Sequence, residues 1–452
     1  MVVRKKLERP RAQVRRLSVS NFKSFAGADL ELGPLTLLIG PNASGKSNLI
    51  EAVKLLSWMA EGQRIDYVFR RAEDEEVVVR GTAEDLCLDG TAQFAIGCGF
   101  ALRPGSGVSS HEKEHSFEVR LGVSDSEMRI VGEQLTAPDE PVALYEVKEA
   151  TDEYGRDMSV AYNNFKPGGR KPQIVCTDEH LILTQLHTPA RFGKSHRKAQ
   201  DVIPSVTRGL ADALAGILFI DPEPRRMREY WNRSERKLRG DGANLSSVLY
   251  DLCEKQGRKQ EVLDFVRRLP EGEIGDIEFI ETDRADVMLR LEEDFRGSTR
   301  RTDAPLLSDG TLRVLAVAAA VLSAPEGSLV VVEEIDNGVH PSRAEMLVEN
   351  LQRVSKDRDL RVLLSSHNPA LLDALPADAM PDVACCFRDP EDGTSRVKRL
   401  DEAQRYPALV GRGSLGHSMS RGEIEDFLKE EVSPGDRSQR KLQWLKEFED
   451  QT

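Results

Sequence analysis

The chain has 452 residues, of which 39% are hydrophobic and 31% charged, and its formal net charge is −13. These values are typical of a globular protein with one large or two ordinary domains, and the acidic balance argues against a surface coated for nonspecific nucleic-acid binding. No apolar stretch is long enough to cross a bilayer, the start lacks a secretory h-region, and six scattered cysteines form no C-x-x-C pair. We therefore expect a cytoplasmic protein with reduced thiols and no membrane association.

The chain begins with a basic segment. Residues 1–16 carry seven lysines and arginines against one acid, Glu8. We interpret this segment as a tail, for which two roles remain open. It is either a solvated end of the chain or an arm that contacts DNA or a partner protein.

A glycine-rich loop follows the apolar run Leu35–Ile39 and matches G-x-x-x-x-G-K-[ST], with apolar residues at helical spacing after it. Gly40 and Gly45 permit a tight path in which successive N–H groups cradle phosphate oxygens at the positive end of a helix. Lys46 supplies a charge for the β- and γ-phosphates, and Ser47 offers a hydroxyl to Mg²⁺. The candidate nucleotide-binding residues are Gly40, Pro41, Asn42, Ala43, Ser44, Gly45, Lys46, Ser47 and Asn48.

The middle of the chain changes from strand-like to helix-like patterns. Apolar and polar residues alternate with period two around residues 92–100, 117–121 and 128–131, which predicts antiparallel strands. From about residue 202 to 269, apolar residues recur at helical spacing without a sustained heptad pattern. This segment therefore predicts a compact helical lobe and excludes a long coiled coil.

A second phosphate-site pattern occurs before the apolar helix expected over 314–322. Serine and glycine directly before a helix form an anion site from a hydroxyl and free N–H groups. The residues of this signature are Ser308, Asp309, Gly310 and Thr311. Asp309 adds a negative charge to such a site, so we expect its side chain to point away, toward a partner or its own helix.

Two further strands end in polar residues. The apolar run 329–332 ends in two carboxylates, Glu333 and Glu334. The first can hold Mg²⁺ through water, and the second can polarise an attacking water. The apolar run 362–366 leads to His367, and a histidine at the tip of a buried strand can sense a γ-phosphate.

The order of these four motifs resembles that of the ABC-type ATPases of the RecF and SMC class. Residues 19–25, V-S-N-F-K-S-F, are similar to the start of RecF-like proteins. Residues 308–313 and 333–341, together with the G-S-L-G of 413–416, resemble stand-alone bacterial ATPases often encoded in defence loci. The resemblance covers both ends of the chain well and the middle poorly.

This resemblance implies an α/β fold: a P-loop NTPase head of the ABC type, with an antiparallel β subdomain and an inserted helical lobe. The expected domains are a tail over 1–16, the first half of the head over 17–200, the helical insertion over 201–272, the second half over 273–400 and a helical extension over 401–452. The class also implies a D-loop residue, Asp336, and a glutamine that links the γ-phosphate and the metal to the insertion. Gln185 is the candidate, and the start of a packing helix is the alternative interpretation.

The resemblance further implies Mg²⁺-dependent ATP hydrolysis in a homodimer or higher homo-oligomer, with the signature of one copy completing the site of the other. The expected output is control of a separately encoded nuclease or toxin in anti-phage or anti-plasmid defence. One alternative is a DNA repair or replication ATPase that clamps DNA directly. Another is a nucleotide-gated scaffold that barely hydrolyses ATP and holds a toxin inactive.

Overall fold

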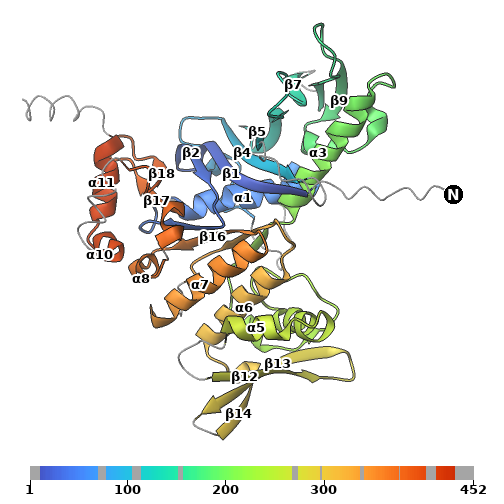
Figure 1. The fold of residues 1–452 in the computed structure, drawn as a ribbon. Coiled ribbons are helices and arrows are strands. Elements are labelled where there is room, and N and C mark those ends of the chain that lie inside the picture. Colours follow the sequence, from blue (N-terminus) through green and yellow to red (C-terminus); the bar gives the residue numbers. More distant parts are fainter. Residues whose placement is uncertain are drawn as a thin grey trace, which may run out of the picture.

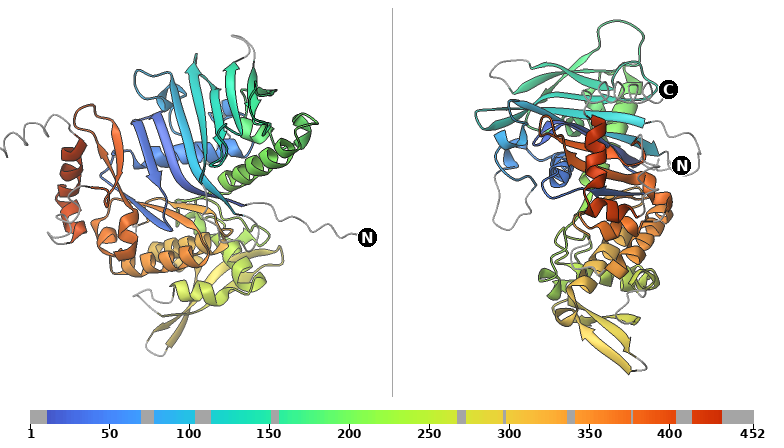
Figure 2. Two further views of the ribbon diagram at one scale, coloured as in Figure 1. Left: turned by 45° about the horizontal axis from the view of Figure 1, so that its top comes forward. Right: turned by 90° about the vertical axis from the view of Figure 1, so that its left-hand side faces the viewer.

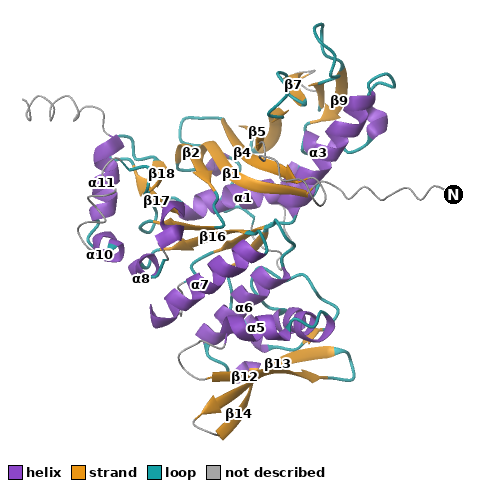
Figure 3. Ribbon diagram, in the orientation of Figure 1, coloured by secondary structure: helices purple, strands orange, loops and turns teal. Residues whose placement is uncertain are grey.

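The computed structural model describes residues 11–69, 78–103, 114–150, 156–266, 273–295, 298–335, 341–375, 377–403 and 414–432. A mixed sheet of 14 strands runs through the molecule, and a second sheet of four strands lies at the opposite end (Figure 1). Among the described residues, no helix is both long and apolar enough to span a membrane. Helices fill the space between the two sheets, which confirms the expected α/β fold (Figure 3).

The parallel part of the large sheet carries the motifs. Its strand order is β10-β15-β16-β3-β17, with bounds Leu218–Ile220, Leu329–Val332, Arg361–Ser366, Leu35–Ile39 and Val383–Arg388. Every residue of β3 and β15 is buried. Both faces of these strands are covered, which explains their unbroken apolar runs. Because parallel strands share one carboxyl edge, the residues that follow β10, β15, β16 and β3 meet there.

The remainder of the large sheet is mostly antiparallel and continues in the order β18-β2-β1-β4-β5-β6-β7-β8-β9. The strands span Ser395–Arg399, Phe25–Glu31, Arg11–Phe22, Gln93–Arg103, Glu114–Ser124, Glu127–Thr136, Tyr145–Ala150, Asp157–Tyr162 and Gln173–Thr177. This confirms the antiparallel strands expected around residues 92–131. The expected tail is wrong for residues 11–16, because these residues belong to β1. Within this strand, the Arg16 side chain forms ion pairs with Asp29 and Glu114.

Two hydrophobic cores lie on opposite faces of the large sheet. Along β3, Leu37 belongs to one core and Leu38 to the other, as the alternation of a strand requires. The first core contains α6 (Asp309–Ser323) and α7 (Pro341–Asp357). The second contains α1 (Lys46–Ala60) and α3 (Arg197–Ala215), which are joined by a hydrogen bond of 2.7 Å from Ser57 Oγ to Leu214 O. The helix that starts at the glycine-rich loop is therefore anchored to the antiparallel half of the head.

The expected helical insertion over 201–272 is only partly helical. Its first boundary falls inside α3, and β10 then joins the large sheet before the chain enters a lower lobe. The elements of that lobe are η4 (Arg226–Arg228), β11 (Trp231–Asn232), α4 (Leu245–Tyr250), the π-helical turn η5 (Asp251–Lys255) and α5 (Lys259–Val266). The second half of the head was expected from residue 273, but the first strands of that range form a separate sheet with β11 (Figure 2). They are β12 (Glu273–Glu281), β13 (Asp286–Phe295) and β14 (Ser298–Asp303), followed by η6 (Ala304–Leu306).

Several short helices complete the described chain. They are η1 (Ile65–Tyr67), η2 (Glu84–Leu86), α2 (Ile182–Gln185), η3 (Pro189–Arg191), α8 (Pro369–Asp373), η7 (Ala377–Asp382), α10 (Leu415–Ser420) and α11 (Glu423–Val432). Gly416 donates its N–H to Asp373 Oδ1 at 2.7 Å, and a Cβ at Gly416 would overlap Pro369 O. This close approach between α10 and α8 gives a physical reason for the last glycine of the G-S-L-G sequence.

Candidate nucleotide-binding site

The glycine-rich loop connects β3 to α1 and needs glycine at two places. Gly40 has φ of 147° and Gly45 has φ of 116°, both in the range that disfavours side chains. A Cβ at Gly40 would overlap Cys386 O, and one at Gly45 would overlap Ser395 Oγ. The sequence predicted the tight path, whereas only the fold shows that the β17–β18 hairpin closes against the loop.

That hairpin holds the loop through several contacts between residues distant in sequence. Cys386 Sγ lies 3.2 Å from Ser44 O, and Arg388 Nε donates to Ala43 O at 3.0 Å. Ser24 Oγ accepts hydrogen bonds from Asn48 Nδ2 and Ser395 Oγ, each at 2.8 Å. The conformation of the loop is therefore set by β17, β18 and the turn before β2, as well as by the loop sequence.

The same turn also contacts the first helix through charge. Lys23, which has φ of 48°, and Arg80 both form ion pairs with Glu51 on α1. The Glu51 side chain is 9% exposed, so its two cationic partners replace most of its lost hydration. This ion-pair cluster explains why the N-F-K-S-F sequence, far from the loop along the chain, belongs to the site.

The loop is built to hold phosphate. Lys46 Nζ folds back onto the carbonyl oxygens of Gly40 at 2.5 Å and Pro41 at 2.9 Å. Ser44 Oγ is buried and has no hydrogen-bond partner among the described residues. The 15-residue helix α1 begins at Lys46, so its N-terminal partial charge and free N–H groups face the same region. Phosphate oxygens of a bound nucleotide would accept hydrogen bonds from the Lys46 ammonium group and from these N–H groups.

Three expected functional residues follow neighbouring parallel strands. Glu333 and Glu334 follow β15, and His367 follows β16, which pairs with both β15 and β3. Glu333 N donates to Ile220 O at 2.9 Å, and Glu334 N donates to Ser365 Oγ at 3.1 Å. Glu334 and His367 are exposed at the carboxyl edge where the glycine-rich loop also begins. The structure therefore gathers these candidates at one edge of the sheet.

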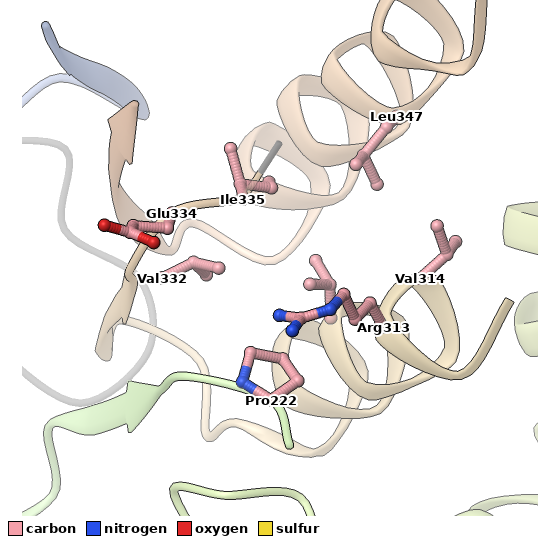
Figure 4. A pocket seen from close by; sticks show the side chains of 8 residues that line it. Pro222, Arg313, Val314, Val332, Glu334, Ile335 and Leu347 are labelled. Carbon is pink, nitrogen blue, oxygen red and sulfur yellow. The ribbon is translucent and has the colours of Figure 1, made fainter. Parts of the chain in front are cut away.

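Glu334 lies at a special backbone position. Its φ is 45°, a region that costs a non-glycine residue about 1 kcal/mol or more and is enriched at functional sites. A small pocket behind it is lined by residues of α6, α7 and the β10 loop, among them Arg313, Leu347 and Pro222 (Figure 4). The Glu334 carboxyl group points away from the apolar side chains of that pocket (Figure 4). It is therefore presented to solvent, where a substrate water could bind.

Sequence reasoning missed Asp221, which follows β10 and adjoins the same edge. Burial of its carboxyl group raises the pKa, and the nearby negative charge of Glu333 raises it further, while Lys54 and Arg313 lower it. The preceding run Leu218–Ile220 has only three residues, too few to mark a buried strand by pattern. Only its pairing with β15 shows that Asp221 belongs to the site.

The signature lies at the N-terminus of α6. Ser308 Oγ accepts a hydrogen bond from Thr311 N at 3.1 Å and lies 2.8 Å from Thr311 Oγ1. Asp309 Oδ1 lies 2.7 Å from Arg228 Nη2, so its side chain is directed toward the segment after β10 and not toward its own helix. Ser308 and Asp309 are exposed, and Gly310 is buried. The hydroxyl of Ser308 is accessible to a second molecule.

One expected residue, Gln185, does not join the site. Gln185 accepts a hydrogen bond from Thr177 N and donates to Thr177 O and His180 O at 2.8 and 2.9 Å. It lies beside β9, the last strand at the far edge of the large sheet. The phosphate-linking and metal-binding role is therefore wrong, and Gln185 lies at the end of the short helix α2 instead of at the start of a helix. Asp336 lies outside the described residues.

The donor set suits Mg²⁺ bound together with phosphates. Ser47 is exposed at the start of α1, and Glu333 lies at the end of β15. Within the described parts of the chain, no group of three His, Cys, Asp or Glu side chains could hold a metal ion by itself. Mg²⁺ prefers a few protein oxygens, phosphate oxygens and retained waters. Ser47 and Glu333 fit this pattern.

A strand, a phosphate loop and a helix, with acids and a histidine on the next two parallel strands, define a P-loop ATPase head. Two family models match the chain: one described as "AAA domain, putative AbiEii toxin, Type IV TA system" over residues 188–373, and one described as "AAA domain" over residues 16–85. These two segments of the chain are similar to AAA domains, and short stretches are similar to RecF proteins and to a structural maintenance of chromosomes protein. This confirms the resemblance drawn from the motifs.

Curated relatives match only short stretches. A DNA replication and repair protein RecF from Gloeobacter violaceus is 45% identical over 69 residues, which are 15% of this chain and 16% of that protein. An OLD nuclease from Thermus scotoductus is 44% identical over 43 residues, 10% of this chain and 8% of that protein. Among solved structures, an SMC head domain from Thermotoga maritima has a TM-score of 0.41 at 14% identity, covering 86% of this chain and 98% of that one. The chain thus spans less than a fifth of either curated relative.

Proposed function

We propose that this protein binds Mg²⁺·ATP and hydrolyses it between two copies of the chain. The observation that carries the proposal is the shared carboxyl edge of β3, β15 and β16, which bears the glycine-rich loop, Glu333, Glu334 and His367. A nucleotide whose phosphates lie on the loop would have its terminal phosphate directed toward that edge. The signature hydroxyl, exposed on α6, is available to a second copy.

Each residue has a distinct task in the proposed reaction. Lys46 leaves its loop carbonyls to contact the β- and γ-phosphates, and the loop N–H groups bind the remaining oxygens. Glu334 orients a water for in-line attack on the γ-phosphorus and accepts its proton, while His367 contacts the γ-phosphate. Ser47 and Glu333 hold Mg²⁺, which offsets charge on the phosphate oxygens. Ser308 of the second copy donates to the same phosphate.

We further propose that ATP-dependent pairing of two copies controls a separately encoded effector, a nuclease or toxin, in a cytoplasmic defence system. Two comparisons support this choice: the description of the family model over 188–373 names a toxin, and one relative is described as a nuclease. The other relative, described as a replication and repair protein, supports direct DNA clamping as the second candidate.

One experiment separates these proposals. Phosphate release from ATP is measured with purified protein and Mg²⁺, and the mass of the Glu334→Gln variant is measured by sedimentation with and without ATP. Turnover together with ATP-dependent doubling of mass supports the paired ATPase, and absence of both overturns it. Tight, strongly salt-dependent binding of duplex DNA by the isolated chain would instead favour the clamp. Pairing with negligible turnover would favour the scaffold.

A further inference from the structure

We propose that Lys54 is a built-in counter-ion of Glu333, which Mg²⁺·nucleotide must displace, and that Asp221 receives the displaced ammonium group. The pair Lys54–Asp221 would thereby set the Mg²⁺ concentration at which the protein binds nucleotide. This inference rests on the proposed function, because it concerns the same site.

The first observation is the ion pair itself. Lys54 Nζ lies 2.8 Å from Glu333 Oε1, and the two side chains are only 17% and 19% exposed. Lys54 comes seven residues after Ser47 on α1, which places both on the same face of the helix, two turns apart. The ammonium group therefore neutralises the carboxylate that we assign to Mg²⁺ together with Ser47.

The second observation is an alternative anionic partner for the Lys54 ammonium group near its present position. Phe219 lies in β10, and Asp221 is the first residue after that strand. The Phe219 ring centroid lies 5.7 Å from Lys54 Nζ, and the Asp221 carboxyl is close enough for Lys54 to lower its pKa. Lys54 thus has an aromatic face and a second carboxylate beside its present partner.

The electrostatic argument follows from these neighbours. A divalent cation near Glu333 repels an ammonium group that is 2.8 Å from the same carboxylate. In a partly buried site, a charge left without a partner is costly, so the ammonium group must find another anion. Asp221 supplies it, and every charge remains paired after the exchange. Arg313 and Glu334 also face Asp221 and contribute charges of opposite sign to its surroundings.

The decisive measurement is the Mg²⁺ concentration for half-maximal binding of a fluorescent, non-hydrolysable ATP analogue. Lys54→Met keeps much of the side-chain length and removes the charge, so the midpoint should fall about fivefold or more, the lower end of typical coupling between two ligands. Asp221→Asn removes the receiving carboxylate, so the midpoint should rise. Lys54→Arg keeps the charge and should stay near wild type.

A matched control is Lys198→Met, since Lys198 pairs with Glu140 at 3.2 Å in the antiparallel half of the head. Its midpoint should not move. Thermal unfolding gives a second readout: Lys54→Met should lower the melting temperature of the nucleotide-free protein, because Glu333 loses its partner. Mg²⁺ and nucleotide together should then restore more stability to this variant than to wild type.

A Lys54→Met midpoint within twofold of wild type, or the same shift in Lys54→Arg, would overturn the counter-ion role. An unchanged midpoint in Asp221→Asn would overturn the exchange. These outcomes differ from failure of the proposed function itself, which would appear as absence of Mg²⁺-dependent nucleotide binding in the wild-type protein. A lysine that only stabilises the fold would lower the melting temperature of every ligand state equally and leave the midpoint in place.

Discussion

Arg228 and Asp309 join the loop after β10 to the signature: Arg228 Nη2 lies 2.7 Å from Asp309 Oδ1 and also donates to Leu307 O at 2.9 Å. These contacts flank Ser308 on both sides. The segment that ends at Arg228 begins at Asp221, beside the Glu333 carboxylate. A single short stretch of chain therefore touches both the carboxyl edge of the parallel strands and the signature.

We predict that Arg228→Ala lowers ATP turnover by about tenfold while nucleotide affinity stays near wild type. The lost contacts free the backbone around Ser308, whose hydroxyl would act on the phosphate of a second copy. Stability should change by about 1 kcal/mol or less, since Asp309 is largely exposed. Steady-state phosphate release and equilibrium nucleotide binding check this, with Arg225→Ala, exposed on the same loop, as control. Equal losses in both variants would contradict a specific role of the Arg228 contacts in positioning Ser308.

Lys46→Ala should abolish nucleotide binding or turnover. The ammonium group of Lys46 donates hydrogen bonds to the carbonyl oxygens of Gly40 at 2.5 Å and Pro41 at 2.9 Å, and phosphate oxygens are the partners that its charge suits best. Equilibrium binding of a fluorescent ATP analogue, together with phosphate release, tests the prediction. ATPase activity close to wild type would show that the nucleotide binds elsewhere.

Glu334→Gln should keep ATP affinity, reduce turnover by about a hundredfold or more, and accumulate the paired state. The amide preserves the shape of the side chain but cannot accept the proton of the attacking water. Sedimentation with and without ATP reports the pairing, and phosphate release reports the turnover. Normal hydrolysis in this variant would move the base to another residue, with Glu333 next.

Ser308→Arg should leave ATP binding by one copy intact and block hydrolysis, because a long cation would occupy the place of the opposing phosphate. Mixing this variant with Lys46→Ala sharpens the test. In a mixed dimer one composite site has both defects and the other has neither, so partial activity should return. If mixed dimers form but show no activity, either Ser308 does not act on the site of the second copy or hydrolysis requires two intact sites. Either result would contradict the simple composite site.

The fifth prediction concerns Glu133, a buried residue of the antiparallel half. Its carboxylate accepts hydrogen bonds from Tyr145 OH, Ile182 N and Leu183 N at 2.7, 2.8 and 2.6 Å. Burial raises the pKa of Glu133 to about 7, well above the usual range of a glutamate, despite these hydrogen bonds. The folded protein therefore binds this proton more tightly than the unfolded chain, and the resulting stability is lost as pH rises toward 7.

The free energy of unfolding of the wild-type protein should accordingly fall between about pH 4.5 and pH 7. The Glu133→Gln variant should lack this contribution, because its amide does not titrate. The difference is at most about 3 kcal/mol. Urea unfolding of both proteins at pH 5, 6, 7 and 8 measures it. Parallel stability curves for the two proteins would contradict a carboxyl group that titrates near neutrality.

The sequence alone predicted the features that lie in one continuous stretch. The glycine-rich loop, the signature at the start of α6 and the two carboxylates after β15 each need only their own neighbours, because backbone conformation and strand ends are local properties. Period-two patterns likewise predicted β4, β5 and β6. The motif order was sufficient to indicate the class of ATPase.

The tertiary structure decided which residues distant in sequence meet at these motifs. Lys54 and Glu333 are 279 positions apart, and Arg228 and Asp309 are 81 apart. It also placed β12–β14 in a separate sheet and tied Gln185 to Thr177 instead of to a phosphate. Such pairings depend on strand order and on charges brought together by folding, so the sequence pattern around each residue carries no signal of its partner. The shared carboxyl edge of β10, β15, β16 and β3 is what joins separate motifs into one site.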